Sequence, residues 1–471
     1  MPSVGRSIPH ESAVGHVTGS APYLCDLPAA VDELAVVGVG SPVAAGRIVS
    51  IDPSKALQLP GVVGVYTHRD LPVGGVNHFG PIFHDEPFLA EDEAAYLGQP
   101  VACVAAESLE IARQAAALVK VEAEAAEPVL TIEQAIECES YLGPVRHINR
   151  GDLDAAFADA PHAFEGTFTC NGQEQFYLES QACLAVPEEA GRLRLISSTQ
   201  NPTETQMVAA EVLGLGMHEV ICECRRMGGG FGGKETQSAI PALMAGLVAL
   251  KTNRSARVVY GKTLDMRITG KRHETRADYR VAFDDTGRLL GLDVTFTSNG
   301  GAFADLSTSV MERTMLHADN AYHLPAVSIT GRIARTNLPP NTAFRGFGGP
   351  QGVVATENIL QQIAERLGRD ALDVRRTNLY VDGDPDRSVT PYGQVVRDHV
   401  LQETFDQLEA TSGYRRRMAD VVQFNHTSRT HVKGLAVTAI KFGISFTTKF
   451  LNQGNALVHV FTDGSVQVST G

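Results

Sequence analysis

The sequence of 471 residues contains no tryptophan, only seven cysteines and no long apolar run. The cysteines are scattered, and neither they nor the fifteen histidines form a Cys-x-x-Cys or His-Glu-x-x-His motif. The sequence therefore indicates neither a disulfide framework nor a zinc or iron–sulfur site built from neighbouring ligands. The longest apolar stretch, residues 239–250, is shorter than the roughly 20 residues that cross a bilayer, and residues 1–27 lack the apolar core of a secretory signal. We expect no membrane partner and a cytoplasmic location.

Basic residues are outnumbered in this chain, with 40 Lys and Arg against 54 Asp and Glu, for a net charge of −14. This excess of acid disfavours a nucleic-acid partner, although it is compatible with a local basic pocket for a small anion. The apolar fraction of 43% is typical of a folded globular protein. At about 150 residues per domain, the length suggests about three domains.

Apolar runs and helical periodicities alternate along the chain, which predicts an α+β, multidomain fold. A strand at 101–106, a helix at 108–119 and a strand from 121 predict a β-α-β unit within an N-terminal α/β domain, residues 1–130, followed by a linker, residues 131–150. The next domain, residues 151–380, shows strand patterns at 167–170, 182–186 and 193–197, helical patterns at 204–213, 237–250 and 353–367, and a hairpin around Asp285-Thr286-Gly287.

The C-terminal part follows a segment rich in Pro, Gly and Asp, residues 381–395, which predicts a linker or a long loop. Residues 396–471 then begin another domain and end in a second predicted hairpin around Asp463-Gly464. A sheet that opens with one hairpin usually needs further strands or a covering helix. We therefore expect this last domain to be incomplete.

The densest signal is Gly228-Gly-Gly-Phe-Gly-Gly-Lys-Glu235, which lies between an alternating strand and a predicted helix. Glycines let backbone N–H groups approach a ligand at such a junction. The segment fails as a dinucleotide fingerprint because no acidic residue follows about 20 positions later, and it fails as a P-loop because Glu235 stands where Ser or Thr is needed. Its core recurs as Gly346-Phe-Gly-Gly349. Two copies favour ligand contact over the alternative of an ordinary structural turn.

Two further segments combine a possible site with a simpler structural alternative. Ser198-Thr-Gln-Asn-Pro202 precedes a predicted helix, and the alternative is an N-cap through Asn201 or Thr203. Met311-Glu-Arg313 lies in a mostly apolar stretch, and the alternative is a structural pair between Glu312 and Arg313.

Taken together, these motifs resemble the molybdopterin-binding subunits of the xanthine dehydrogenase family. The resemblance runs from Gly19-Ser-Ala-Pro-Tyr23 to the final hairpin. It implies the xanthine oxidase-type architecture, with an N-terminal α/β hammerhead-like domain followed by cofactor-binding domains. The motifs that carry it are Arg226-Met-Gly-Gly-Gly-Phe-Gly-Gly-Lys-Glu235, Phe344-Arg-Gly-Phe-Gly-Gly-Pro-Gln-Gly352, Ser198-Thr-Gln-Asn-Pro202, Met311-Glu-Arg313 and Lys441-Phe-Gly-Ile-Ser-Phe-Thr447.

The resemblance implies that Gln200, Phe231 and Arg345 contact a molybdopterin cofactor. The dithiolene sulfurs of that cofactor hold the molybdenum, so the resemblance implies no metal ligand from the protein.

The resemblance also implies substrate contacts. Phe347 and Phe446 would sandwich a planar heterocycle, with Thr447 hydrogen-bonded to it. Glu235 and Arg313 match the polar substrate-binding and catalytic pair of the family. Hydroxylation of a purine carbon pushes negative charge onto the ring, which an arginine at its far edge would stabilise, while Glu235 could exchange a proton with a ring nitrogen.

For the whole enzyme, the resemblance implies oxidation of hypoxanthine or xanthine to urate, with water as oxygen source and NAD as final acceptor. The [2Fe-2S] clusters, FAD and NAD would belong to an iron–sulfur/FAD partner subunit, in a dimer of heterodimers. The alternatives are an aldehyde or N-heterocycle oxidase of the same superfamily and a truncated, non-catalytic fragment. Because related subunits continue beyond the final hairpin, we expect the isolated chain to be inactive.

Overall fold

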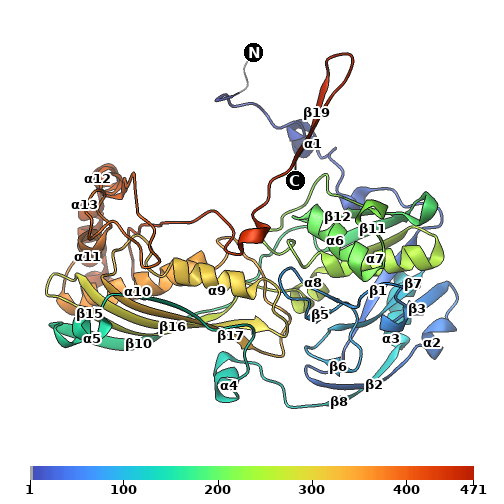
Figure 1. The fold of residues 1–471 in the computed structure, drawn as a ribbon, viewed down its shortest axis with the longest axis horizontal. Helices are drawn as coiled ribbons and strands as arrows, with labels where there is room; N and C mark the ends of the chain where they lie inside the picture. The colour runs from blue at the N-terminus through green and yellow to red at the C-terminus, as the bar shows by residue number, and fades with distance from the viewer. Residues whose placement is uncertain (1–3, 471) are drawn as a thin grey trace.

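The computed structural model of the protein describes residues 4–470. The chain forms two lobes that lie side by side along the long axis, each built on one large β-sheet (Figure 1). No helix among residues 4–470 has both the length and the apolar character needed to cross a membrane.

The first lobe is built on a seven-stranded sheet in the order β13-β12-β11-β14-β1-β7-β3. Helix α6 (Pro202–Val212) packs on α7 (Ala239–Thr252), and α7 packs on the sheet. Helix α7 is apolar on all sides and almost entirely buried, as expected for a core helix. The strands are β1 (Leu34–Gly40), β3 (Val62–Tyr66), β7 (Pro100–Ala106), β11 (Ala182–Pro187), β12 (Leu193–Ser197), β13 (Val220–Glu223) and β14 (Ala256–Val259).

The three elements expected between residues 101 and 125 all form. Strand β7 is followed by α3 (Leu109–Leu118), whose N-cap Ser108 accepts a hydrogen bond from the Ile111 amide at 3.2 Å, and by β8 (Lys120–Ala125). However, β8 pairs antiparallel with β2 (Gly46–Asp52) in a separate sheet ordered β6-β2-β8. Strand β7 is buried along its whole length, whereas β8 is largely exposed, so only β7 suits a central strand of the large sheet. The three elements therefore do not form one crossover unit.

Residues 131–150 are not a linker. They contain α4 (Ile132–Glu137), capped by Thr131, and β9 (Arg146–Arg150), which pairs antiparallel with β17 (Ala326–Arg335) at the edge of the second sheet. The seven-stranded sheet also joins strands from both sides of the expected boundary, because β14 pairs parallel with β1. The interruption in periodicity therefore marks a stretch of short elements that connects the two lobes.

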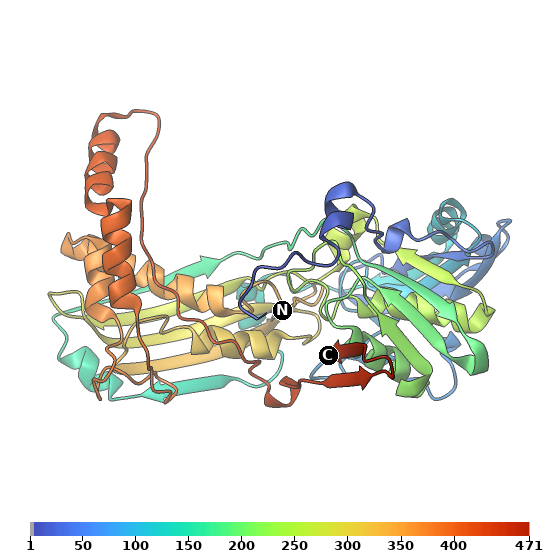
Figure 2. The same ribbon diagram turned by 90° about the horizontal axis from the view of Figure 1, so that it is seen from above.

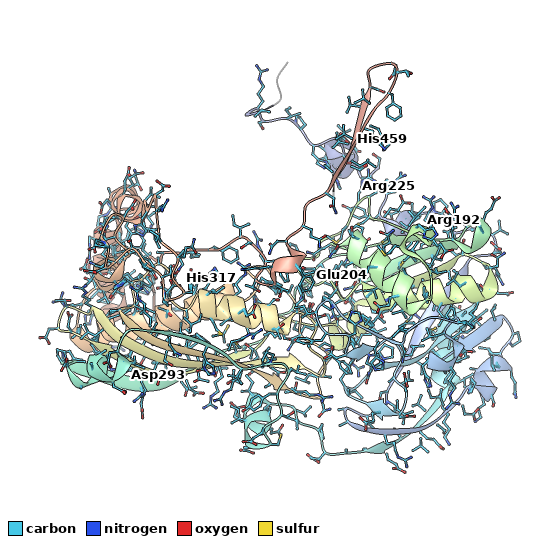
Figure 3. The ribbon with its side chains drawn as sticks, viewed as in Figure 1. Arg192, Glu204, Arg225, Asp293, His317 and His459 are labelled. Carbon is cyan, nitrogen blue, oxygen red and sulfur yellow. The ribbon has the colours of Figure 1, made fainter. Side chains whose placement is uncertain are left out.

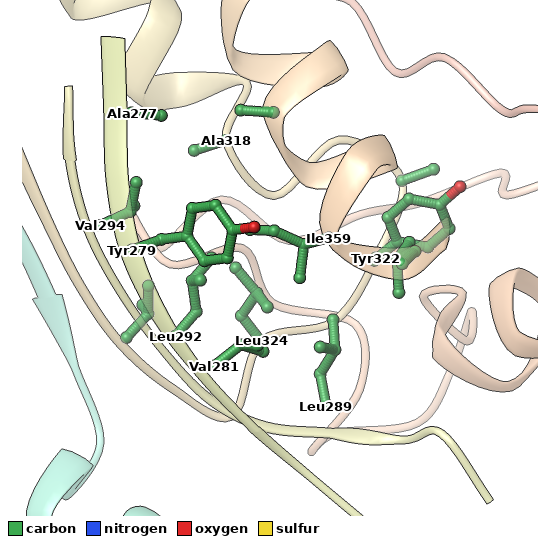
Figure 4. Packing of buried hydrophobic residues seen from close by; sticks show 14 of the residues in the cluster. Ala277, Tyr279, Val281, Leu289, Leu292, Val294, Ala318, Tyr322, Leu324 and Ile359 are labelled. Carbon is green, nitrogen blue, oxygen red and sulfur yellow. The ribbon is translucent and has the colours of Figure 1, made fainter. Parts of the chain in front are cut away.

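The second lobe is built on a five-stranded sheet in the order β10-β15-β16-β17-β9. The hairpin expected around residues 285–287 joins β15 (Thr275–Phe283) to β16 (Leu289–Gly301), and β10 (His162–Cys170) pairs with β15. Helices α9 (Ser307–Leu316) and α10 (Gly349–Leu367) cover one face of the sheet. Figure 4 shows the core between them, with Tyr279, Val281, Leu292 and Val294 of the sheet near Ile359 of α10.

The C-terminal part leaves the second lobe and returns over α9. Residues 381–395 contain no helix or strand, as expected, and α12 (Leu401–Ser412) and α13 (Tyr414–Thr427) project from the lobe (Figure 2). The second expected hairpin forms from β18 (Ala456–Val460) and β19 (Val466–Thr470). The remaining elements are α1 (Ala13–Thr18), α2 (Ser54–Leu57), α5 (Leu153–Ala158), α8 (Lys262–Ile268), α11 (Ala371–Asn378), β4 (His78–Phe79), β5 (Glu86–Pro87) and β6 (Glu93–Ala94).

Candidate cofactor and substrate site

The two Gly-Phe-Gly-Gly segments adopt the same tight turn. Phe231 and Phe347 have φ values of 55° and 49°, and the glycines that follow them have φ values of 99° and 95°. In each segment the amide of the fourth residue donates to the carbonyl of the first, at 2.8 and 2.9 Å. These angles match a type I′ turn, in which both central residues need positive φ. A phenylalanine held in this strained region is a feature that clusters at functional sites.

A backbone hydrogen bond joins the two turns, because the Arg345 amide donates to the Phe231 carbonyl at 2.9 Å. The approach is so close that a Cβ atom on Gly232 would lie 2.6 Å from the Ala343 carbonyl oxygen. The first turn precedes α7 of the first lobe and the second turn leads into α10 of the second lobe. The candidate site therefore lies where the two lobes meet.

The side chain of Gln200 organises the first turn. Its Oε1 accepts from the amides of Gly232 and Lys234 at 2.8 and 3.3 Å. Its neighbour Asn201 caps α6, because the Asn201 side chain accepts from the Glu204 amide at 3.2 Å. The N-cap alternative for this segment is thus confirmed for Asn201, and it coexists with a role for Gln200 at the loop.

The lysine of the first loop lies behind it. The Lys234 side chain is fully buried, and its Nζ lies 2.7 Å from Ser198 Oγ and 3.4 Å from Glu179 Oε2. The same Glu179 oxygen accepts from the Gly228 amide at 2.7 Å. Burial lowers the pKa of Lys234, and the Glu179 carboxylate opposes that shift. Sequence reasoning considered this lysine only within a failed P-loop motif, whereas the structure shows a buried ion pair that anchors the loop.

Glu235 lines a small cavity of about 10 Å³ between the lobes, with the room of about one water molecule. Burial, followed by the nearby charge of Asp305, raises the pKa of Glu235 to about 7. Glu204, labelled between the lobes in Figure 3, lines the same cavity. Burial, with the charges of Asp305 and Glu235, raises the pKa of Glu204 to about 8. The carboxyls come from separate elements, so no motif could have revealed this cluster.

Arg313 is buried on α9, with 5% of its surface exposed. Its guanidinium donates to the backbone carbonyls of Gly443 and Ser445 and lies 5.8 Å from the centre of the Phe347 ring. Burial lowers the pKa of Arg313. The tertiary path of residues 441–447 across α9 thus defines the surroundings of this arginine.

Arg313 is bonded to neither of the two acidic residues considered beside it. It does not pair with Glu312, which instead accepts from Arg146 at 3.1 Å. It also does not share a cavity with Glu235: Arg313 lines a separate cavity of about 430 Å³ together with His317 and Lys441 (His317 is labelled in Figure 3). The structure therefore does not bring the expected catalytic pair, Glu235 and Arg313, to one cavity.

The rings of Phe347 and Phe446 contact each other directly, with centroids 5.0 Å apart and an interplanar angle of 53°. This is an aromatic pair without a third ring between its members. The expected sandwich around a heterocycle would require the two rings to separate, and it stays a prediction. Thr447 lies nearby, and its hydroxyl donates to the Ser309 carbonyl at 3.3 Å, which leaves its oxygen able to accept.

Comparison with known families identifies the family of the domain that contains the two joined turns. The family described as "Molybdopterin cofactor-binding domain" matches residues 138–379, about half of the chain. The chain belongs to this molybdopterin cofactor-binding family. A second molybdopterin cofactor-binding domain matches residues 407–471, and the "Aldehyde oxidase and xanthine dehydrogenase, a/b hammerhead domain" matches residues 18–127. The expected fold class, a hammerhead domain followed by cofactor-binding domains, is confirmed.

The chain is similar over nearly its full length to several xanthine dehydrogenases. It is 43% identical to the xanthine dehydrogenase/oxidase of Mus musculus, covering 99% of this chain and 35% of the relative. It is 41% identical to the xanthine dehydrogenase of Emericella nidulans, covering 99% of this chain and 34% of the relative. The chain thus spans about a third of the length of the curated relatives it matches.

Solved structures share the fold of this molybdopterin cofactor-binding chain. The aldehyde oxidoreductase from Desulfovibrio gigas superposes with a TM-score of 0.84 at 26% identity, covering 99% of this chain and 53% of that one. Quinoline 2-oxidoreductase from Pseudomonas putida 86 gives a TM-score of 0.80 at 26% identity, covering 90% of this chain and 56% of that one.

The residues of the first turn fit the organic part of a molybdopterin. Within residues 4–470, the amides of Gly229, Gly230 and Phe231 donate to no protein acceptor, and Gln200 Nε2 is likewise without a protein acceptor. The Phe231 ring is 46% exposed. Four unpaired donors beside an exposed aromatic ring suit a flat, acceptor-rich pterin. Arg345 joins this cradle through its backbone, and its side chain is exposed.

Proposed function

We propose that this chain is the molybdopterin-binding part of a molybdenum hydroxylase that oxidises hypoxanthine or xanthine. The observation that carries the proposal is the junction of the two glycine turns, where the Arg345 amide donates to the Phe231 carbonyl beside three amides, of residues 229–231, that have no acceptor among residues 4–470. The names of the relatives at 41% and 43% identity support a purine substrate. Conversion to urate with oxygen from water is the finer part of the proposal.

When bound, the cofactor supplies the redox chemistry of molybdenum. The chain's own residues would orient it: Gln200 Nε2 and the amides of residues 229–231, which have no acceptor within residues 4–470, would donate to the pterin, and the exposed Phe231 ring would contact it. Glu235, with its pKa raised to about 7 by burial and then by Asp305, is available as a proton donor to a ring nitrogen. Arg313 would stabilise negative charge that develops on the purine. In the present arrangement, these two residues reach a ligand only from different cavities.

Electron exit requires groups outside this chain in our proposal. None of the seven cysteines follows an iron–sulfur spacing. We therefore assign [2Fe-2S] clusters and FAD to a partner subunit, with NAD as final acceptor, in a dimer of heterodimers in the cytoplasm.

A second candidate is the oxidation of aldehydes or other N-heterocycles. The bonds of Arg313 to the carbonyls of Gly443 and Ser445 favour it, because a guanidinium engaged with backbone has fewer donors left for a purine. The third candidate, a fragment without turnover, keeps the pterin site and lacks catalysis.

Pterin binding tests the first step of this proposal. The chain would be purified from a host that makes molybdopterin, and its pterin content would be measured by fluorescence after oxidation. We expect bound pterin in the native chain, a several-fold loss in Gln200→Ala and no loss in the control Gln114→Ala, an exposed position on α3. Native chain without pterin would contradict the assignment.

Ligand choice separates the first two candidates. Equilibrium dialysis of the pterin-loaded chain with radiolabelled hypoxanthine should show binding that Glu235→Ala weakens. Displacement by benzaldehyde, with no effect of Glu235→Ala on hypoxanthine, would favour the aldehyde candidate instead.

A further inference from the structure

Asp305 is a buried carboxyl that is surrounded by donors. It lies directly before α9 and is 4% exposed. Its Oδ1 accepts from Thr342 Oγ1 at 2.7 Å and from the Leu306 amide at 2.5 Å. Its Oδ2 accepts from Thr236 Oγ1 at 2.7 Å and from Gln237 Nε2 at 2.9 Å.

This hydrogen-bond pattern favours the ionised form of Asp305. Each carboxylate oxygen receives one N–H group, and an N–H group cannot accept a proton in return. Burial raises the pKa of Asp305, and the four donors oppose that effect. Hydrogen bonds given to a carboxylate stabilise its charge, as at other buried carboxylates that accept several bonds.

The cavity beside Asp305 contains acids and no base. Among its lining residues, Glu86 comes from β5, Glu204 from α6, Glu235 from the loop before α7 and Asp305 from the segment before α9, and none is Lys, Arg or His. Asp85, next to Glu86, adds a further carboxyl that accepts from the Ala304 amide at 2.8 Å. Within residues 4–470, the carboxyl of Glu235 is given no hydrogen bond by a protein donor, whereas Glu204 accepts from Asn201 Nδ2 at 2.7 Å. Carboxylates that line one cavity of about 10 Å³ repel one another in a poorly solvated space, which disfavours the ionisation of all of them at neutral pH.

We propose that Asp305 is a buried anion whose charge adds to the effect of burial and holds protons on Glu204 and Glu235 up to about neutral pH, so that Glu235 offers a proton donor to the ligand of this site. Asp305 is thus a positioning residue that acts through Glu235. Glu204 is the second carboxyl whose proton its charge stabilises. The statement about the ligand rests on the proposed function. The protonation itself is a property of the unliganded chain.

A titration of the 471-residue chain, without cofactor or substrate, tests the proposal. Glutamate labelled with ¹³C at the side-chain carboxyl would be incorporated, and the Glu204 and Glu235 signals would be assigned from the Glu204→Gln and Glu235→Gln spectra. We expect midpoints near the values for the native cavity, about 8 for Glu204 and about 7 for Glu235. In Asp305→Asn, both midpoints should fall by about one unit or more, because the fixed charge is gone. Unchanged midpoints in Asp305→Asn would overturn the proposal.

A second variant covers the case in which Asp305→Asn does not fold. Asp305→Ser removes the charge and keeps a hydroxyl that can accept from the surrounding donors. The Glu235 midpoint should fall in this variant as well, and an unchanged midpoint would again overturn the proposal. Asp285→Asn, an exposed site on the β15–β16 hairpin, is the matched control and should leave both midpoints in place. A chain that binds neither pterin nor hypoxanthine but shows the expected shifts would refute the proposed function and leave the role of Asp305 intact.

Discussion

The substitution Lys234→Met tests whether the buried ion pair behind the first glycine turn anchors that turn. The side chain is fully buried, and methionine fills similar apolar space without the charge. Loss of the Lys234 ammonium group removes its 2.7 Å contact with Ser198. It also leaves Glu179, whose side chain is only 10% exposed, without a cation. Breaking a buried pair on one side typically costs about 3–5 kcal/mol, because the remaining charge stays desolvated. We expect a loss of stability in this range.

The double substitution Lys234→Met with Glu179→Gln separates charge from packing. Glutamine keeps an acceptor for the Gly228 amide, which Glu179 accepts at 2.7 Å, and it removes the stranded charge. The double variant should therefore be more stable than Lys234→Met alone, with a coupling of about 1–3 kcal/mol.

Urea unfolding followed by far-ultraviolet circular dichroism would measure these differences, since the chain has no tryptophan to report by fluorescence. The control is Lys251→Met at the exposed end of α7, which should change stability by less than about 0.5 kcal/mol. A cost below about 1 kcal/mol for Lys234→Met, or a double variant no more stable than Lys234→Met alone, would refute the reasoning.

Three further predictions concern the turns and the two cavities. Burial, followed by the charge of Asp305, raises the pKa of Glu235 in the folded state from 4.5 to about 7, so the native chain loses stability as the pH rises from 4.5 through 7. Glu235→Gln should therefore be more stable than the native chain by about 3 kcal/mol at pH 8 but not at pH 4. Equal stability differences at both pH values in urea unfolding would contradict this prediction. Gly232→Ala should cost about 2 kcal/mol or more in the same assay, because φ is 99° and the new Cβ would lie 2.6 Å from the Ala343 carbonyl, whereas Gly261→Ala, which has open space, should be nearly neutral; similar costs for both would argue against a tight junction. In a complete subunit, Arg313→Met should lower kcat/KM for xanthine by about 10²–10³ and affect small aromatic aldehydes much less, and equal losses in steady-state assays would assign Arg313 a structural role.

Features that depend on a few neighbouring residues could be predicted from the sequence. The Asp-Gly hairpins form because their turn residues accept the required φ values, and Ser108 and Asn201 cap their helices through bonds within three residues. The repeated Gly-Phe-Gly-Gly segment likewise indicates the same turn at both places, because glycine at the second central position adopts positive φ without steric strain.

Assignments that depend on which distant segments pack together needed the tertiary structure. Strand β8 forms where the sequence predicts it, but it pairs with β2 in a separate sheet. Its largely exposed side chains do not suit the buried surroundings of β7. The contact between Phe347 and Phe446 depends on how residues 441–447 cross α9, and no local pattern encodes that path. The roles of the paired rings and of Glu235 and Arg313 therefore stay predictions.

The sequence by itself determined the family and the position of the two glycine turns, because motifs of four to ten residues carry both backbone conformation and likeness to relatives. Only the tertiary structure decided the electrostatics of the site. Glu86, Glu204, Glu235 and Asp305 are separated by up to 219 positions, since 305 − 86 = 219, and the fold buries them around one cavity. Their proton affinities depend on burial and on the distances between the carboxyls, and both are set by the way the two lobes pack around these side chains.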